Sequence, residues 1–275
     1  NIGDVHFVMF DNLRFYESTV SGYNLGFTDE EVAWLKEDLK FVPTDKRVVI
    51  CYHAPLYDNF SSENAKAIFD QLQPYTEPTA MAGHTHYTRY YVNSTYGMRE
   101  YILSAACGYF WRSNTSLDGI PNGYYIFEFD GTRIINSYFK GTDRDHSLQM
   151  RLYRGNATYG GPFTSYTYEY SANDIVANIF FADDNWTFKV YEDGKPTDGK
   201  LTRISNHGDY WIWGYTVGVL QQSCSTICHH LYKYTLHNPA AKQIRVEATD
   251  PYGNVYSSDQ IIPDNDFSTE APNNK

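Results

Sequence analysis

The first 82 residues alternate between apolar runs and helical stripes. Residues 5–10 and 46–52 predict strands, and a third apolar run ends at Ala82. The second run is continuous, as expected for a strand in a sheet that is covered on both faces. Helical patterns separate the runs, so the order strand, helix, strand, helix, strand predicts a layered α/β unit.

Both helices carry start or stop signals. Thr28 and Glu31 have the spacing of a capping box, in which each side chain bonds the other residue's backbone N–H. Pro43 and Pro74 end the two helical patterns. The apolar stripes of the two helices are Val32, Leu35 and Leu39, followed by Ala65, Ile68, Phe69 and Leu72.

From residue 89 onward the pattern predicts strands. Four are expected up to residue 139: residues 90–92, 99–104, 124–129 and 133–139. Beyond a polar stretch, roughly seven short strands are typical of an immunoglobulin-like or fibronectin-like sandwich. The predicted organisation is therefore an α/β domain at 1–145, a connector at 146–165, an all-β sandwich at 166–263 and a disordered tail at 264–275.

Three histidines follow the predicted inner strands. His53 comes directly after the strand at 46–52, and His84 and His86 follow Ala82-Gly83. Strand ends in an open α/β sheet gather ligands, so these rings are expected at one rim. Gly83 is expected to turn the backbone, because glycine tolerates a positive φ. A lone histidine is more often a hydrogen-bonded residue, but His-x-His combined with a second strand-end histidine favours a metal site for Zn, Fe, Ni or Cu.

The segments Val49-Ile50-Cys51-Tyr52-His53-Ala54-Pro55 and Ala82-Gly83-His84-Thr85-His86 resemble the last two signature motifs of the calcineurin-like metallophosphoesterases. The resemblance implies an αββα sandwich, of which this chain would hold half, and two divalent ions of Zn, Mn or Fe acting on a phosphoester substrate. It also implies that His53 and His84 share one ion and that His86 binds its neighbour.

The family's earlier motifs do not precede His53. Asp4-Val5-His6 has the spacing of the first motif, but the Gly-Asp-x-x-Asp and Gly-Asn-His motifs do not follow it, and Asn206-His207 lies far downstream. Both are interpreted as chance matches. The chain is therefore expected to be the carboxyl-terminal part of a longer phosphoesterase, whose missing amino-terminal half supplies the other ligands and the general acid. Alone, it is expected to bind metal poorly and to be inactive.

The segment around Cys107 has a counterpart near the metal centre in the resembled family. That likeness makes Tyr109, Trp111 and Arg112 candidates for the substrate pocket, with Arg112 able to bind a phosphate oxygen through its guanidinium. The alternative is an aromatic plug over the sheet edge.

Charge and composition narrow the function. A formal net charge of −11 argues against a nucleic-acid or anionic-membrane binder, which needs basic residues. No apolar run approaches the ~20 residues of a membrane span. Five Asn-x-Ser/Thr triplets are compatible with a periplasmic or extracellular protein.

Four cysteines are too few for a disulfide framework. Cys51 and Cys107 lie in apolar runs and are expected to be buried thiols. Cys224 and Cys228 precede two histidines, so zinc, a local disulfide and free thiols all remain open. The 26 tyrosines and the acidic balance also permit a second function, a scaffold that contacts glycan or protein through an aromatic-rich sandwich.

Overall fold

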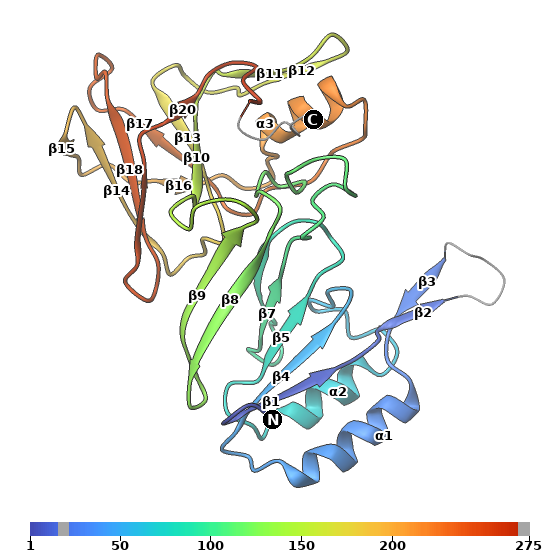
Figure 1. Cartoon of the computed structure of the whole chain (residues 1–275). Helices are drawn as coiled ribbons and strands as arrows, with labels where there is room; N and C mark the ends of the chain where they lie inside the picture. Colours follow the sequence, from blue (N-terminus) through green and yellow to red (C-terminus); the bar gives the residue numbers. More distant parts are fainter. Residues whose placement is uncertain (16–21, 269–275) are drawn as a thin grey trace. The chain divides into compact units, whose positions relative to one another are not determined.

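The computed structural model describes residues 1–15 and 22–268, which are mostly β-strand with few helices (Figure 1). The chain forms two compact units. Unit 1 contains residues 1–85, 89–103 and 127–136, and unit 2 contains residues 86–88, 104–126 and 137–275. In the described ranges, no helix combines the length and apolar character needed to cross a membrane.

Unit 1 is built on a five-stranded sheet in the order β1-β4-β5-β7-β6. Four strands run parallel, and β6 pairs antiparallel with β7. The strands of this sheet are β1 (Val5–Met9), β4 (Arg47–Tyr52), β5 (Thr79–Ala82), β6 (Arg89–Val92) and β7 (Arg99–Ile102). A separate antiparallel pair is formed by β2 (Leu13–Phe15) and β3 (Tyr23–Leu25).

Two helices pack against one face of this sheet. The first helix, α1 (Asp29–Asp38), begins at Thr28 with both bonds of the predicted capping box, and a 3₁₀ turn (Leu39–Phe41) follows it. The second helix, α2 (Ala65–Leu72), buries the whole predicted stripe. Together with alternate strand residues such as Val48 and Ile50, these side chains form the core of unit 1.

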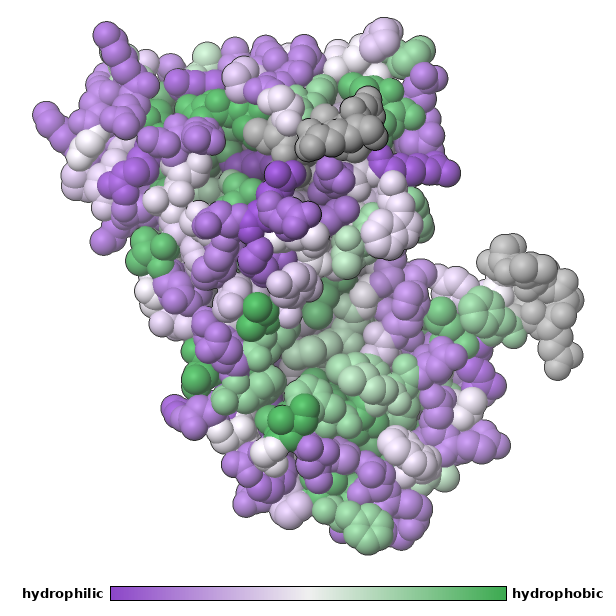
Figure 2. Space-filling view, in the orientation of Figure 1, coloured by the Kyte–Doolittle hydropathy of each residue, from purple (hydrophilic) through white to green (hydrophobic). Residues whose placement is uncertain are grey.

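The opposite sheet face is covered only in part. A hairpin of β8 (Gly123–Asp130) and β9 (Arg133–Gly141) contributes residues 127–136 to unit 1. Its Phe129 ring lies edge-on to Phe7 of β1, with centroids 6.1 Å apart. Two residues further along β1, Met9 is 68% exposed, and hydrophobic residues gather over this sheet in Figure 2. The β1 end of this face is therefore apolar and accessible.

Unit 2 contains two larger sheets, with strand orders β16-β17-β13-β10-β20 and β15-β14-β18-β19. Inward side chains of both sheets, such as Ile175 and Val246, share one core. A two-stranded ribbon, β11-β12, is separate from both sheets. The strands of unit 2 are β10 (Met150–Arg154), β11 (Thr158–Gly160), β12 (Ser165–Thr167), β13 (Asp174–Ile179), β14 (Thr187–Glu192), β15 (Lys195–Pro196), β16 (Thr202–Arg203), β17 (Leu231–Thr235), β18 (Ile244–Thr249), β19 (Val255–Ser258) and β20 (Ile261–Ile262).

The prediction of strands alone beyond residue 165 is wrong for one segment. A short helix, α3 (Tyr210–Trp213), runs into a π-helical turn (Gly214–Val219). Asp209 caps α3 by accepting bonds from the N–H groups of Trp211 and Ile212. Trp211 packs in a second core with Tyr153 of β10, so the five-stranded sheet is covered on both faces.

The segment predicted as a connector, 146–165, contains β10 and β11. Leu152 and Tyr153 of β10 are fully buried, and β10 pairs with β13 over five residues. The segment therefore belongs to a sheet, because its alternate residues enter two different cores. Of the predicted tail, residues 269–275 lie outside the described residues. Phe267 packs against Trp211, with ring centroids 5.9 Å apart.

The buried carboxylate of Glu192 on β14 binds both β17 and the turn that follows β17. Glu192 accepts bonds from the Tyr234 hydroxyl at 2.7 Å, from His237 N at 2.8 Å and from Asn238 N at 2.7 Å. Burial raises the pKa of Glu192, but the three hydrogen bonds together lower it by more. The pKa therefore lies below its usual 4.5. Stability from this group is therefore present above pH 4.5 and is lost as the pH falls through the folded-state pKa.

We expect Glu192→Gln to lower the free energy of unfolding by about 1–3 kcal/mol at pH 7, because the amide replaces an acceptor of three bonds with a donor. The difference from wild type should shrink as the pH falls below 4.5 and through the lowered folded-state pKa, where the wild-type carboxylate becomes protonated. Urea unfolding at several pH values measures it, with exposed Glu169→Gln as the control. Equal destabilisation at pH 3 and pH 7 would contradict this account.

Candidate functional site

Two of the predicted histidines lie where parallel strands of unit 1 end. His53 follows β4, and Gly83-His84 follows β5. The two strands pair in parallel, and their last pair is Tyr52 with Ala82. Gly83 N donates to His53 O at 2.9 Å, so the ladder continues one step beyond both strands. This bond holds the two loops together at the sheet edge.

The rings of His53 and His84 face each other. His53 Nε2 lies 3.0 Å from His84 Nδ1, and both residues are exposed. Two imidazole nitrogens bound to one ion at about 2.0–2.1 Å would lie about 2.8–3.4 Å apart for angles between 90° and the tetrahedral value. The two nitrogens are within hydrogen-bonding distance of each other, and the same spacing fits two ligands of a single ion.

Tyr23 is the outer partner of His84. Its hydroxyl lies 2.6 Å from His84 Nε2, and its ring is edge-on to the imidazole. Metal-binding histidines commonly use the second ring nitrogen in this way, which fixes the tautomer and the ring orientation. Tyr23 carries no local sequence signal of this role, because it lies on β3, 61 residues before His84.

The backbone of the His-x-His turn differs from the expectation for Gly83. The positive φ values occur at the histidines themselves, 69° at His84 and 56° at His86. A Cβ at Gly83 would meet nothing closer than 3.9 Å. Non-glycine residues in the left-handed region cost about 1–3 kcal/mol and concentrate at functional sites. The strain therefore lies in the candidate ligands.

His86 belongs to unit 2 and has its own partners there. Its Nδ1 donates to Gly108 O at 2.6 Å, and its backbone O accepts from Leu117 N at 3.0 Å. The Phe110 ring lies against the imidazole, with centroids 4.5 Å apart. Because Nδ1 carries the proton in this bond, Nε2 presents its lone pair and can act as a ligand.

A buried asparagine fixes the loop that carries His53. Asn12 is fully buried, and its Oδ1 accepts from His53 N at 3.1 Å and from Ala54 N at 3.0 Å. Its Nδ2 donates to Ala54 O at 2.7 Å. One side chain therefore satisfies three backbone groups of the loop.

Glu100 fixes the next residues of the same loop. It lies on β7, is 3% exposed, and accepts from Leu56 N at 2.9 Å and Tyr57 N at 2.9 Å. The Tyr52 hydroxyl also donates to it at 2.6 Å. Burial, followed by the charge of Glu100, raises the pKa of Tyr52. Tyr52 therefore remains a neutral donor.

The predicted pocket residues lie on a strained turn of unit 2. Phe110 and Trp111 both have positive φ, 48° and 63°, and Trp111 is 82% exposed. Tyr109 is 8% exposed and packs inward. The Arg112 guanidinium bonds to the Gln222 side chain. The turn thus presents two aromatic rings and one cation on the surface of unit 2.

Within residues 1–15 and 22–268, neither the three histidines His53, His84 and His86 nor the other candidates form a group of three or more His, Cys, Asp or Glu side chains that could hold an ion. All four cysteines are free thiols, so Cys224 and Cys228 form no disulfide. Burial raises the pKa of the Cys224 thiol to about 11. His6 bonds to Asp38 at 2.6 Å, and His207 Nδ1 lies 2.6 Å from Gly208 O.

We expect Asn12→Ala to destabilise unit 1 by about 1–3 kcal/mol, because two N–H groups and one C=O of the His53 loop lose their partner. Urea unfolding followed by circular dichroism measures the change, and hydrogen exchange at Ala54 reports the loop itself. Asn59→Ala is the control, because Asn59 is exposed. An equal effect of both variants would show that Asn12 does not hold the loop.

Two substitutions at His84 distinguish the energetic cost of its left-handed backbone from the effect of losing its ring. We expect His84→Gly to be more stable than His84→Ala by about 1 kcal/mol, because only alanine retains the cost of the left-handed conformation. At Thr85, where φ is not positive, the order should reverse. Thermal unfolding of the four variants measures both differences, and the same order at both positions would contradict the assigned backbone.

Comparison with protein families identifies the chain through its later part. The family model "C terminal of Calcineurin-like phosphoesterase" matches residues 100–256, which is more than half of the chain. The match begins within β7, after the three histidines, so it is independent of the motifs that carry them. Comparison with curated proteins finds none that matches. The chain belongs to the calcineurin-like phosphoesterase family and contains the C-terminal region of such a protein.

Proposed function

We propose that the protein hydrolyses phosphoesters at a centre of two divalent ions of Zn, Mn or Fe, for which this chain supplies His53, His84 and His86. The observation that carries the proposal is the 3.0 Å approach of His53 Nε2 to His84 Nδ1, with Tyr23 behind His84. His86, two residues further along the chain, is the candidate ligand of the second ion. Family membership supports the hydrolase class.

The residues of the chain orient the ligands. Two bound ions would lower the pKa of an attacking water and offset charge on the phosphoryl oxygens. Tyr23 and the Gly108 carbonyl hold the second nitrogens of His84 and His86, which selects their tautomers. Asn12 and Glu100 keep the His53 loop in place. The general acid is expected from the sequence upstream of Asn1, together with the carboxylate ligands.

We also propose that the turn at 109–112 contacts the substrate. Trp111 offers an exposed ring, and the Arg112 guanidinium can exchange its bond to Gln222 for a phosphoryl oxygen. Tyr109 is packed inward, so its proposed role is to hold the turn in place and not to contact the substrate.

The fold supports a larger catalytic domain. We propose that unit 1 is half of an αββα sandwich and that the apolar sheet face around Met9 is covered by the amino-terminal half of the intact protein. The two larger sheets of unit 2 are proposed as an immunoglobulin-like or fibronectin-like sandwich, and a periplasmic or extracellular location is proposed from the glycosylation-type triplets.

The test uses the intact protein including the sequence upstream of Asn1. We expect it to bind close to two equivalents of Zn, Mn or Fe and to hydrolyse p-nitrophenyl phosphate or its diester. His84→Ala should lower the metal content and reduce kcat/KM by at least about a hundredfold, in the range found for lost ligands and outer partners. Residues 1–275 alone should show little of either property.

His237→Ala is the matched control, because it removes a half-exposed imidazole that pairs with Asp198. It should leave metal content and hydrolysis unchanged. An intact protein that hydrolyses neither ester with any of the three metals would contradict the proposal. If it also binds no metal, a non-catalytic scaffold is the better account.

A further inference from the structure

Arg89 of unit 1 is a cation that forms no hydrogen bond or ion pair within residues 1–15 and 22–268. It begins β6 and is half-buried. Over the same ranges, the buried side-chain nitrogens that lack a partner belong to other residues, so the guanidinium nitrogens of Arg89 are accessible to solvent. A guanidinium has five N–H donors, and those of Arg89 are therefore available to a ligand.

Two tyrosine rings hold the Arg89 guanidinium in place. Its Cζ lies 5.1 Å from the ring centroid of Tyr57 and 5.0 Å from that of Tyr91. The two rings lie edge-on to each other, with centroids 5.1 Å apart. A ring face attracts a cation without taking up its N–H donors in conventional hydrogen bonds, so the fork is fixed in place and remains able to bind an oxyanion.

Two carboxylates interact with Tyr91, and both accept hydrogen bonds from groups other than Arg89. Asp58 accepts from the Tyr91 hydroxyl at 2.5 Å and from Ser94 N at 2.9 Å. Glu100 is buried and accepts three bonds of its own. Neither of these two residues forms an ion pair with Arg89, so the charge of Arg89 is available to an incoming anion.

Arg89 lies in the last row of paired residues at the sheet edge that bears His53 and His84. This row crosses four strands and consists of Tyr52 of β4, Ala82 of β5, Ile102 of β7 and Arg89 of β6. Neighbouring strands are about 4.8 Å apart, so the Arg89 backbone lies roughly 10 Å from that of β5 and roughly 14 Å from that of β4. Tyr57, which contacts the Arg89 guanidinium, belongs to the loop that begins at His53.

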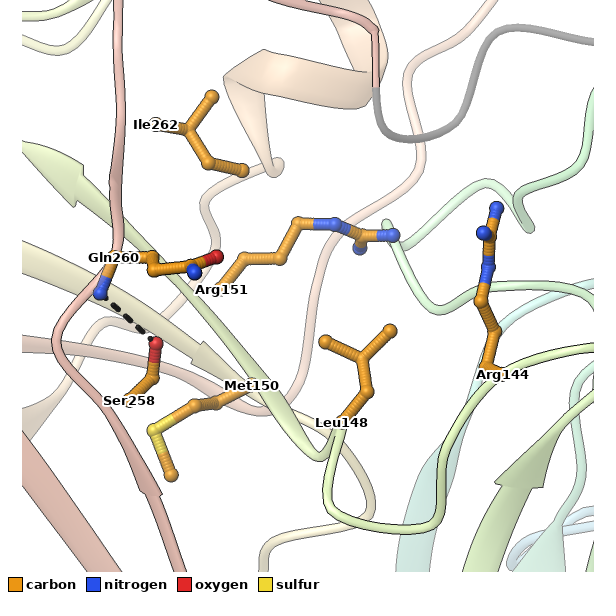
Figure 3. A pocket seen from close by; sticks show the side chains of 7 residues that line it. All are labelled: Arg144, Leu148, Met150, Arg151, Ser258, Gln260 and Ile262. Atoms are coloured by element: carbon orange, nitrogen blue, oxygen red, sulfur yellow. Dashed lines mark hydrogen bonds between the residues drawn. The ribbon is translucent and has the colours of Figure 1, made fainter.

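Two other arginines, Arg144 and Arg151, line a pocket of about 280 Å³ in unit 2 (Figure 3). Both interact with other groups of the protein. The two terminal nitrogens of Arg151 are buried, and its guanidinium lies 4.5 Å from the Trp211 ring centroid. Arg89 differs from both, because its nitrogens are accessible and the contacts of its guanidinium are with ring faces.

We propose that Arg89 binds an oxyanion group of the substrate other than the phosphoryl group that is hydrolysed. This inference rests on the proposed phosphoesterase function, and it narrows the substrate to phosphoesters with a second anionic group, a phosphate or a carboxylate. The spacing of the strands places that group roughly 10–15 Å from the histidine-bearing strands. Arg89 is then a specificity-determining residue, which favours elongated substrates with two charges over those with one.

The first test uses residues 1–275 and measures no hydrolysis. Inorganic phosphate is titrated into the protein while the arginine Nε–Hε signals are followed by NMR. We expect a phosphate-dependent signal that disappears in Arg89→Gln and whose shift decreases as sodium chloride is added. Arg133→Gln is the matched control, because it removes an exposed guanidinium of unit 1 that pairs with Asp130. The proposal is overturned if no phosphate-dependent signal is lost in Arg89→Gln, or if the same signal is lost in Arg133→Gln.

The second test uses the intact protein, including the sequence upstream of Asn1, with hexyl phosphate, hexane-1,6-diol bisphosphate and 6-(phosphonooxy)hexanoate. Arg89→Gln should raise KM by about tenfold or more for at least one of the two doubly charged substrates, because a charge-assisted bond is lost. It should leave kcat, and KM for hexyl phosphate, unchanged. The substrate whose KM rises more identifies the second group as phosphate or carboxylate.

The two tests separate this inference from the phosphoesterase proposal. Hydrolysis of hexyl phosphate with equal KM changes for all three substrates, or with no change for any, overturns the role of Arg89 and supports the hydrolase. An intact protein that hydrolyses none of the three contradicts the hydrolase and with it the narrowing of the substrate. Binding of phosphate at Arg89 is then decided by the NMR titration alone.

Discussion

The candidate site depends on four parallel strands that end at a common edge. β1, β4, β5 and β7 run in one direction, so the loops that leave β4 and β5 start side by side. The bond from Gly83 N to His53 O adds one further step to the ladder. Because this bond fixes both backbones, the imidazoles of His53 and His84 lie close to each other.

Local sequence patterns were sufficient for much of unit 1. The capping box at Thr28 and the stripe of α2 need only neighbours along the chain, and both are present. The positioning residues Asn12 and Glu100 were missed, because their partners lie more than 40 residues away. An acidic residue within the apolar strand at 99–104 was the available signal, since a buried carboxylate needs several donors. The left-handed histidines had no signal, because Gly83 offered a simpler turn.

Unit 2 shows why composition was a weak guide. The tyrosine content permitted an aromatic binding surface, but several tyrosines are buried around Asp209. Tyr153 donates to Asp209 at 2.9 Å, and Tyr168 donates to the same carboxylate at 3.3 Å. The helix α3 had no local signal either. Its cap is the buried Asp209, and its Trp211 packs on strands that are far away in sequence.

The left-handed backbone at residues 84 and 86 restricts which residue types these two positions can accept. β-branched side chains are severely disfavoured there, whereas asparagine and aspartate tolerate it. Evolution or design that exchanges an imidazole at these positions is therefore steered toward carboxylate or amide oxygens. Such donors are harder than nitrogen, so the easiest substitutions would shift the selectivity of the proposed centre toward manganese or magnesium.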